Sequence, residues 1–232
     1  MATPDIILYT NHSCPWAHRA HIALAELNLP FKEEIIDLSV PRTPEYLKIN
    51  PRGLVPSISY NGQILTESGI VAQFLADAHP SHLQPDSGTA EGALTRARIA
   101  FFVDAFFSKV QSVGFKVFSA KTDEEVKAIG DAQVDAVVKE LEPLLGDAKP
   151  FFAGSDKPTL AEVLTGSFVL RLYSSSNFGI IPESVVKDLE ARAPNFHRWA
   201  QAVNAHPSVN GIYDEATWVA RYKERIAKVR AA

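Results

Sequence analysis

The sequence contains only one cysteine, Cys14, among its 232 residues. A single cysteine excludes an internal disulfide, and this composition fits a reducing compartment. If Cys14 forms a mixed disulfide during a reaction, no second protein thiol can release it, so an external thiol must do so. Cys14 stands in the segment 13–19, Ser-Cys-Pro-Trp-Ala-His-Arg, directly after a short apolar run.

The sequence also lacks long hydrophobic runs and an excess of charge of one sign. No apolar run approaches the ~20 residues of a membrane span. Residues 1–5 lack the charged and apolar regions of a secretory signal. The net charge is −4 with acids and bases mixed along the chain, and no basic patch stands out. We therefore expect a cytoplasmic protein that binds neither membrane nor nucleic acid.

The composition is that of an ordinary globular protein, with 46% hydrophobic and 22% charged residues. A chain of this length can form one large domain or two small ones. There are no internal repeats and no low-complexity segments.

The first part of the chain alternates strand and helix patterns. Strands are predicted at 5–10, 31–37, 57–60 and 63–66, and helices at 14–28, 45–48 and from 67 to about 79. Asn61-Gly62 between the last two strands is the strongest short-range hairpin signal. The order β-α-β-α-β-β-α predicts a small α/β layer with a right-handed connection between its two parallel strands.

The second part is helical in pattern. Helices are predicted at 95–118, 123–145, 160–173, twice within 182–205, and at 216–230, with a turn at 151–154. Residues 80–92 are rich in Pro, Ser, Asp and Gly and resemble a linker. We therefore predict an α/β domain at 1–80, a linker at 81–92, and an all-helical domain at 93–232.

Cys14 precedes the predicted helix, with Pro15 at the favourable first helical position. Cysteines at helix N-termini ionise readily because the helix dipole and unpaired backbone N–H groups favour the thiolate. The sulfur could accept from the N–H of Trp16 or Ala17. The alternative is a structural, buried cysteine.

A metal site is a second alternative for this segment. Cys14, His18 and His21 have helical spacings, and His12 is close in sequence. Without a second cluster of ligands this signal is weak. We expect no metal, and we predict that His18 and His21 are exposed on the helix.

Two further elements could bind a ligand. Val55-Pro56 enters a strand, where a cis bond would leave the Val55 backbone free to pair with an extended ligand; the alternative is a plain edge proline. Glu67 and Ser68 open a helix whose N-terminus suits a carboxylate, and Glu67 could accept from an ammonium group. Simple helix capping is the alternative there.

A thiol site, a backbone edge, and an amine and carboxylate site together suit one small peptide, glutathione. The chain resembles the cytosolic glutathione transferases over nearly its whole length, with a thioredoxin-like domain followed by an all-helical domain. Segment 13–19 resembles the cysteine-type classes, omega and the glutathionyl-hydroquinone reductases. Segments 50–56 and 66–68 resemble the omega pattern. Thr159-Leu160-Ala161-Glu162 resembles the family's capping box, with Glu162 where Asp is usual.

This resemblance implies roles for particular residues. Cys14 would carry the mixed disulfide with glutathione. The Val55 backbone, followed by a cis Pro56, would pair with the cysteinyl part. The remaining expected contacts are Glu67 and Ser68 at the γ-glutamyl end and Arg42 at the glycine carboxylate.

The second substrate is expected between the domains. Aromatic residues of the helical part could line an apolar pocket there, and each could equally belong to the core. The predicted pocket residues are Phe106, Phe115, Tyr173 and Trp218, with Phe102 and Phe118 as further candidates.

The predicted function is a glutathione-dependent thiol transferase or reductase acting through Cys14 on small aromatic or disulfide substrates. Fungal enzymes of secondary metabolism also resemble the sequence, so an aromatic natural product is a candidate substrate. The alternatives are conjugation or cis–trans isomerisation using Ser13 or Tyr9, and a non-catalytic ligand-binding member of the family. The family resemblance also implies a homodimer.

Overall fold

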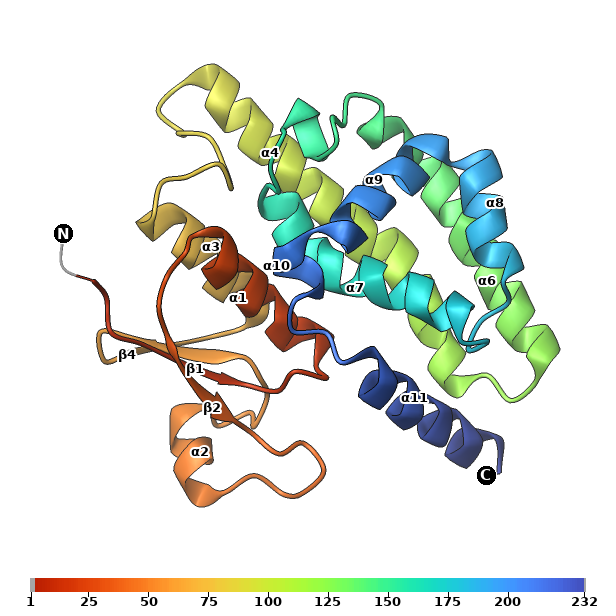
Figure 1. Ribbon diagram of the computed structural model, residues 1–232, viewed down its shortest axis with the longest axis horizontal. Coiled ribbons are helices and arrows are strands. Elements are labelled where there is room, and N and C mark those ends of the chain that lie inside the picture. Colours follow the sequence, from red (N-terminus) through yellow and green to blue (C-terminus); the bar gives the residue numbers. More distant parts are fainter. Residues whose placement is uncertain (1–2, 232) are drawn as a thin grey trace.

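The computed structural model describes residues 3–231. It has a four-stranded sheet with helices on both sides and a larger helical part (Figure 1). The elements of the first part are β1 (Ile6–Thr10), α1 (Pro15–Glu26), β2 (Lys32–Ile35), α2 (Pro44–Ile49), β3 (Ser57–Tyr60), β4 (Gln63–Thr66) and α3 (Ser68–Ala78). The predicted order of strands and helices is confirmed, with ends that differ by a few residues.

The sheet has the strand order β2-β1-β3-β4. Strand β1 pairs parallel with β2 and antiparallel with β3, so that Leu8 lies opposite both Glu33 and Ile58. Strands β3 and β4 form the predicted hairpin around Asn61-Gly62, where both residues have positive φ. Side chains of β1 and β3, including Leu8 and Ile58, are fully buried, which makes these the central strands.

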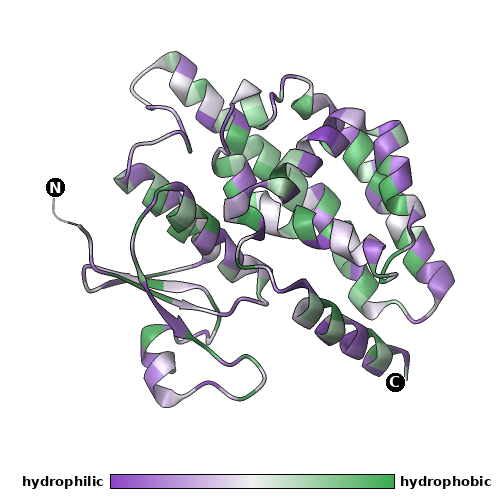
Figure 2. Ribbon diagram, in the orientation of Figure 1, coloured by the Kyte–Doolittle hydropathy of each residue, from purple (hydrophilic) through white to green (hydrophobic). Residues whose placement is uncertain are grey.

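The second part of the chain is helical, as predicted. Its α-helices are α4 (Ala90–Ala105), α5 (Ser112–Gly114), α6 (Asp123–Glu140), α7 (Leu160–Asn177), α8 (Ser184–Arg192), α9 (Pro194–Ala205), α10 (Pro207–Asn210) and α11 (Glu215–Arg230). Short 3₁₀ segments lie at Phe115–Ser119, Glu142–Leu145 and Phe152–Gly154. Figure 2 shows hydrophobic and hydrophilic residues alternating along α11, as expected for an amphipathic helix at the surface.

The predicted single helix over 95–118 is wrong in detail. Helix α4 ends at Ala105, and a π-helical segment, Phe106–Gln111, follows it before α5. The apolar spacing here suits either helical form, so the sequence predicts one uninterrupted helix. π-Helical segments are rare and often lie at functional sites.

Helix α1 lies between the sheet and α7, and α3 packs beside it (Figure 1). Helix α1 is therefore covered on more than one face. This placement makes the predicted exposure of His18 and His21 wrong, because both side chains are buried. Burial lowers the pKa of His21 to about 4 and that of His18 well below its usual range, so both are neutral at pH 7.

Helix α7 is almost entirely buried, and its first turn holds the capping box predicted at Thr159 and Glu162. The Glu162 side chain is inaccessible and accepts four hydrogen bonds. Two come from Thr159, through its backbone N–H and its hydroxyl, both at 2.7 Å. The others come from the N–H of Phe152 at 2.8 Å and from Nε1 of Trp199 at 2.6 Å. Glu162 therefore joins α7, α9 and the segment around Phe152.

Within residues 3–231, no helix combines the length and the hydrophobicity needed to cross a membrane.

We predict that Glu162→Ala lowers the free energy of unfolding by about 3 kcal/mol, because it leaves four buried donors without an acceptor. Glu183→Ala is the control, since Glu183 is exposed and pairs only with Lys187 one turn away. The measurement is urea denaturation followed by circular dichroism. Equal losses in the two variants would contradict the role given to Glu162.

Candidate active site

Two cavities meet at the start of α1. The first has a volume of about 660 Å³ and lies against the sheet side. The second has a volume of about 420 Å³ and extends toward α7 and α11. Cys14, Trp16 and Leu38 line both. A group bound in either cavity can therefore reach the only thiol in the chain.

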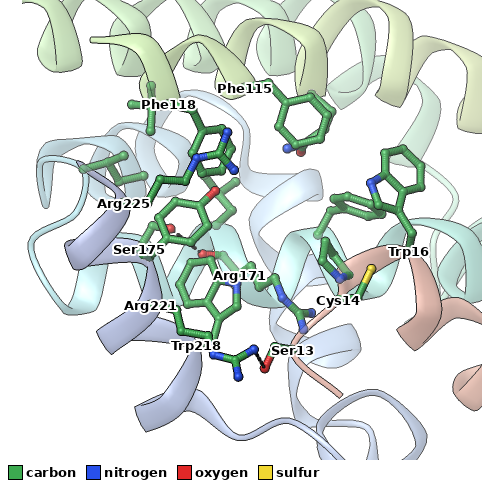
Figure 3. A pocket seen from close by; sticks show the side chains of 18 of the residues that line it. Ser13, Cys14, Trp16, Phe115, Phe118, Arg171, Ser175, Trp218, Arg221 and Arg225 are labelled. Atoms are coloured by element: carbon green, nitrogen blue, oxygen red, sulfur yellow. Dashed lines mark hydrogen bonds between the residues drawn. The ribbon is translucent and has the colours of Figure 1, made fainter. Parts of the chain in front are cut away.

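Cys14 is the N-cap residue of α1, with Pro15 at the first helical position. Its backbone N–H donates to the carbonyl of Asn11 at 3.0 Å, and its carbonyl accepts from the N–H of His18 at 3.1 Å. The expectation that the sulfur accepts from the first turn of the helix is wrong, because the side chain makes no capping hydrogen bond. The thiol is half-buried and points into the second cavity (Figure 3).

Arg171 of α7 reaches toward Cys14 from the opposite side of the second cavity (Figure 3). Only 5% of its surface is exposed. Burial lowers the pKa of Arg171 to about 10, and the nearby Tyr213, Cys14 and Tyr222 oppose this shift. Arg171 thus keeps its positive charge at pH 7, and this charge attracts an anionic group in the second cavity.

Sequence reasoning missed Arg171. A signal exists, because Arg171 is the only basic residue within the apolar pattern of 160–173. A charged residue in a helix that is buried on most sides needs a partner or a function. Its proximity to Cys14, 157 positions earlier in the chain, is set by the packing of α7 against α1.

The first cavity contains all the residues predicted to contact glutathione, namely Arg42, Val55, Pro56, Glu67 and Ser68. The predicted cis bond between Val55 and Pro56 is confirmed. In the part of the chain that the structure describes, the Val55 backbone takes part in no hydrogen bond. Its N–H and carbonyl therefore remain available to a ligand that adds beside β3.

The N-terminus of α3 carries a positive charge supplied by another helix. Nη1 of Arg19 donates to Oγ of Ser68 at 3.1 Å, and its Nε donates to the carbonyl of Leu164 at 2.8 Å. The guanidinium also stacks on Trp16 and Phe107, with ring centroids at 4.6 Å and 4.3 Å. Burial lowers the pKa of Arg19 to about 9, so it stays charged at pH 7.

Arg19 strengthens the anion site predicted at Ser68, because a buried cation now adds to the helix N-terminus. Sequence analysis placed Arg19 in the segment 13–19 without giving it a role. Residue spacing alone does not show that Arg19 of α1 reaches across to α3.

Glu67 is the N-cap of α3 and has a φ of 70°, a backbone conformation that non-glycine residues adopt rarely. Such conformations gather at ligand sites, where surrounding contacts hold them. The Glu67 carboxylate is paired with Arg52 and remains partly exposed at the cavity. It has free acceptor capacity for an ammonium group, because a carboxylate accepts more than one hydrogen bond.

Arg42 lines the first cavity, but its guanidinium mainly holds the loop around it. Nη1 donates to the carbonyls of Asp37 and Val40, each at 2.6 Å, and Nε donates to that of Gly53 at 2.9 Å. These bonds fix the loop between β2 and α2 against the segment before β3. Arg42 therefore shapes this wall of the cavity, and its contact with a carboxylate stays a prediction.

The predicted second-substrate residues divide into two groups. Phe115 and Trp218 line the second cavity, together with Phe118. Phe106 and Tyr173 do not belong to the described lining, so their prediction is wrong. Phe106 is buried in the core, and the hydroxyl of Tyr173 pairs with Nδ1 of His197 at 3.1 Å. Phe102 is also a core residue. Whether an aromatic side chain of a helix faces the core or a cavity depends on how the helix packs, and the sequence pattern does not show this.

The two alternative catalytic residues lie in different surroundings. Ser13 lines the second cavity, and its Oγ accepts from Nη1 of Arg221 at 3.1 Å. Tyr9 is not among the described residues that line either cavity, and it packs against Tyr46 with ring centroids 5.9 Å apart. Burial raises the pKa of Tyr9. Of the two, only Ser13 can contact a ligand beside Cys14.

The histidines near Cys14 do not join it in a ligand set. His12, His21 and Glu33 place their donor atoms within 4.8 Å of one another, a group that could hold a metal ion. Nε2 of His12 lies 2.8 Å from Oε1 of Glu33, and Nε2 of His21 lies 2.9 Å from Oγ1 of Thr10. Among residues 3–231, the Nε2 atoms of both histidines therefore already have hydrogen-bond partners within the protein.

We predict that Arg171→Met lowers the rate of Cys14 alkylation by iodoacetamide at pH 7 about tenfold, because the attacking sulfur is anionic and the variant removes the buried cation from the cavity that Cys14 lines. Arg171→Lys restores most of the rate, since it keeps a positive charge in the same place. Arg192→Met, which removes a surface partner of Asp135, leaves the rate unchanged. A variant that is folded by circular dichroism and reacts at the original rate would refute this role of Arg171.

Comparisons with known proteins agree with this geometry. Residues 13–78 match the family described as glutathione S-transferase, N-terminal domain. A probable glutathione S-transferase of Oryza sativa subsp. japonica is 29% identical, covering 90% of this chain and 93% of the relative. Glutathione S-transferase omega-1 of Mus musculus is 27% identical, covering 88% of this chain and 78% of that protein.

A rice glutathione transferase, solved in complex with glutathione, has the same fold. Its TM-score is 0.82 at 25% sequence identity, covering 98% of this chain and 99% of that one. The four-stranded mixed sheet and the helical part agree with that architecture. The chain has the glutathione transferase fold, and its residues 13–78 match the N-terminal domain of the glutathione S-transferases.

Proposed function

We propose that this protein is a glutathione-dependent thiol transferase in which the thiolate of Cys14 forms a mixed disulfide with glutathione. The observation that carries the proposal is the position of Cys14. It lies at the N-terminus of α1, where two cavities meet, opposite the buried cation of Arg171. The similarity to an omega-1 transferase supports this assignment.

Glutathione is assigned to the first cavity. Its α-carboxylate is placed at the N-terminus of α3, where Ser68 and Arg19 offer hydrogen bonds and charge. Its α-ammonium is placed beside Glu67, and its cysteinyl backbone pairs with Val55. This arrangement directs the sulfur of glutathione toward Cys14, which lines the same cavity.

The reaction follows from thiol–disulfide chemistry. The Cys14 thiolate attacks the glutathionyl sulfur of a mixed disulfide, GS–SR, forming the bond between Cys14 and glutathione and releasing RS⁻. A second glutathione thiolate then attacks that disulfide, which gives GSSG and restores the Cys14 thiolate. The sum of the two steps consumes one free glutathione, because GS–SR and GSH give GSSG and RSH and the glutathionyl group of GS–SR is already at the disulfide level. The chain has no second cysteine, so glutathione has to perform the second step.

The same site offers less support for simple activation of glutathione for conjugation. Conjugation or isomerisation needs a hydroxyl that donates a hydrogen bond to the glutathione thiolate. Ser13 is the candidate, because it lines the second cavity and receives a hydrogen bond from Arg221, which leaves its own proton free to donate. Cys14 is nearer to the first cavity, since it lines both cavities and Ser13 lines one.

We predict that Cys14→Ser lowers thiol transfer from glutathione to hydroxyethyl disulfide at least a hundredfold, because the nucleophile is lost. In the unmodified protein, incubation with oxidised glutathione adds one glutathionyl group to Cys14, and reduced glutathione removes it. Intact-protein mass spectrometry measures both steps.

The control is Ser13→Ala, which leaves thiol transfer largely intact. If Ser13→Ala abolishes activity and Cys14→Ser retains it, conjugation or isomerisation through Ser13 replaces the proposal. Binding of glutathione without turnover by either route, and without an adduct on Cys14, would assign the protein to ligand binding.

A further inference from the structure

The second cavity combines aromatic walls with a positively charged lining. Six aromatic residues line it, from α1, from the segment after the π-helix, from α7 and from α11: Trp16, Phe115, Phe118, Phe168, Trp218 and Tyr222. With a volume of about 420 Å³, it has room for a compound of one or two rings. Aromatic walls of this kind stack on flat ring systems.

Three arginines complete the lining: Arg171, Arg221 and Arg225. Of the described residues that line the cavity, none is Asp or Glu. The chain as a whole carries a net charge of −4, so the positive lining does not follow from composition. Within residues 3–231, none of the three arginines forms an ion pair with a carboxylate, whereas Arg96, Arg98 and Arg192 all do.

The buried member, Arg171, lacks a full set of partners. Its Nη1 donates to Nδ1 of His18 at 3.2 Å and to the carbonyl of Ser167 at 2.8 Å, and its Nε has no partner in the described chain. A buried guanidinium without a counter-ion is costly.

The other two arginines share one face of α11. Trp218, Arg221, Tyr222 and Arg225 follow the spacing i, i+3, i+4, i+7, which places them together along the cavity. Arg225 stacks on Phe118 at 4.3 Å, and Arg221 donates to Ser13 (Figure 3). Asp37 lies within the influence of Arg221, because its pKa is lowered mainly by hydrogen bonds from Ser39 and further by Arg221 and Arg42. Asp37 does not belong to the described lining of the cavity.

We propose that the second cavity selects aromatic compounds that carry a carboxylate or sulfonate, with the rings on the aromatic walls and the anion held by Arg171, Arg221 and Arg225. This inference rests on the proposed function in taking the second cavity as the substrate site. It adds the charge of the substrate, which the catalytic chemistry at Cys14 does not require. Charge-assisted hydrogen bonds from guanidinium to carboxylate or sulfonate are strong and directional.

The test compares naphthalene-2-sulfonate with naphthalene-2-sulfonamide, which has nearly the same shape and no charge at pH 7. Isothermal titration calorimetry on the full chain measures both dissociation constants. We expect the sulfonate to bind about tenfold more tightly, the equivalent of one or two charge-assisted hydrogen bonds. In the double variant Arg221→Gln/Arg225→Gln, the preference falls to threefold or less. Both residues lie on the exposed side of α11, so the fold is expected to remain.

Arg192→Gln is the matched control, because it removes a surface arginine outside the cavity and keeps the preference. Equal binding of the two compounds would overturn the proposal, as would a preference that survives the double variant. The titration needs no turnover, so it is independent of thiol transfer. Cys14→Ser is therefore expected to keep the sulfonate preference even if the protein fails to catalyse thiol transfer.

Discussion

The structure depends on one buried charge, the guanidinium of Arg171, held between α7 and the start of α1. It faces the thiol of Cys14 and has no carboxylate partner among the described residues. A cation in this position attracts a negative charge, whether that charge belongs to a reacting sulfur or to a bound ligand. The catalytic proposal and the substrate proposal therefore share a physical origin.

Two further features hold this charge in place. Helix α1 is enclosed between the sheet and α7, which removes water from the region of His18 and Arg171. The neutral His18 accepts a hydrogen bond from Arg171 without adding a like charge. In the first turn of α7, the carboxylate of Glu162 joins this helix to α9 and to the segment around Phe152.

The two halves of the site differ in how far they follow from the sequence. The first cavity is built from short motifs whose local geometry is largely set by neighbouring residues. The cis bond before Pro56 and the helix start at Ser68 depend on neighbouring residues, and the sequence predicts both. The sequence also predicts the capping box at Glu162. Arg19 and Arg171 were missed in their roles, because each acts on a segment distant in the chain.

Less of the second cavity could be predicted from the sequence. Phe115 and Trp218 line the second cavity, whereas Phe106 and Tyr173 belong to the core. The π-helical segment from Phe106 to Gln111 is not visible in the apolar spacing, and it precedes the residues that turn toward the cavity. The spacing of Arg221 and Arg225 in the sequence places them on one face of α11, but the packing of α7 and α1 decides what that face contacts.

The sequence by itself determined the order of strands and helices, the hairpin and the helix start at Cys14. These properties rest on local backbone preferences and on composition, which act over a few residues. Tertiary structure alone decided that His18 and His21 are buried, that Arg171 faces Cys14 and that three arginines share one aromatic cavity. These properties arise from packing between elements that are distant in the chain, where burial and Coulombic attraction depend on distance in space.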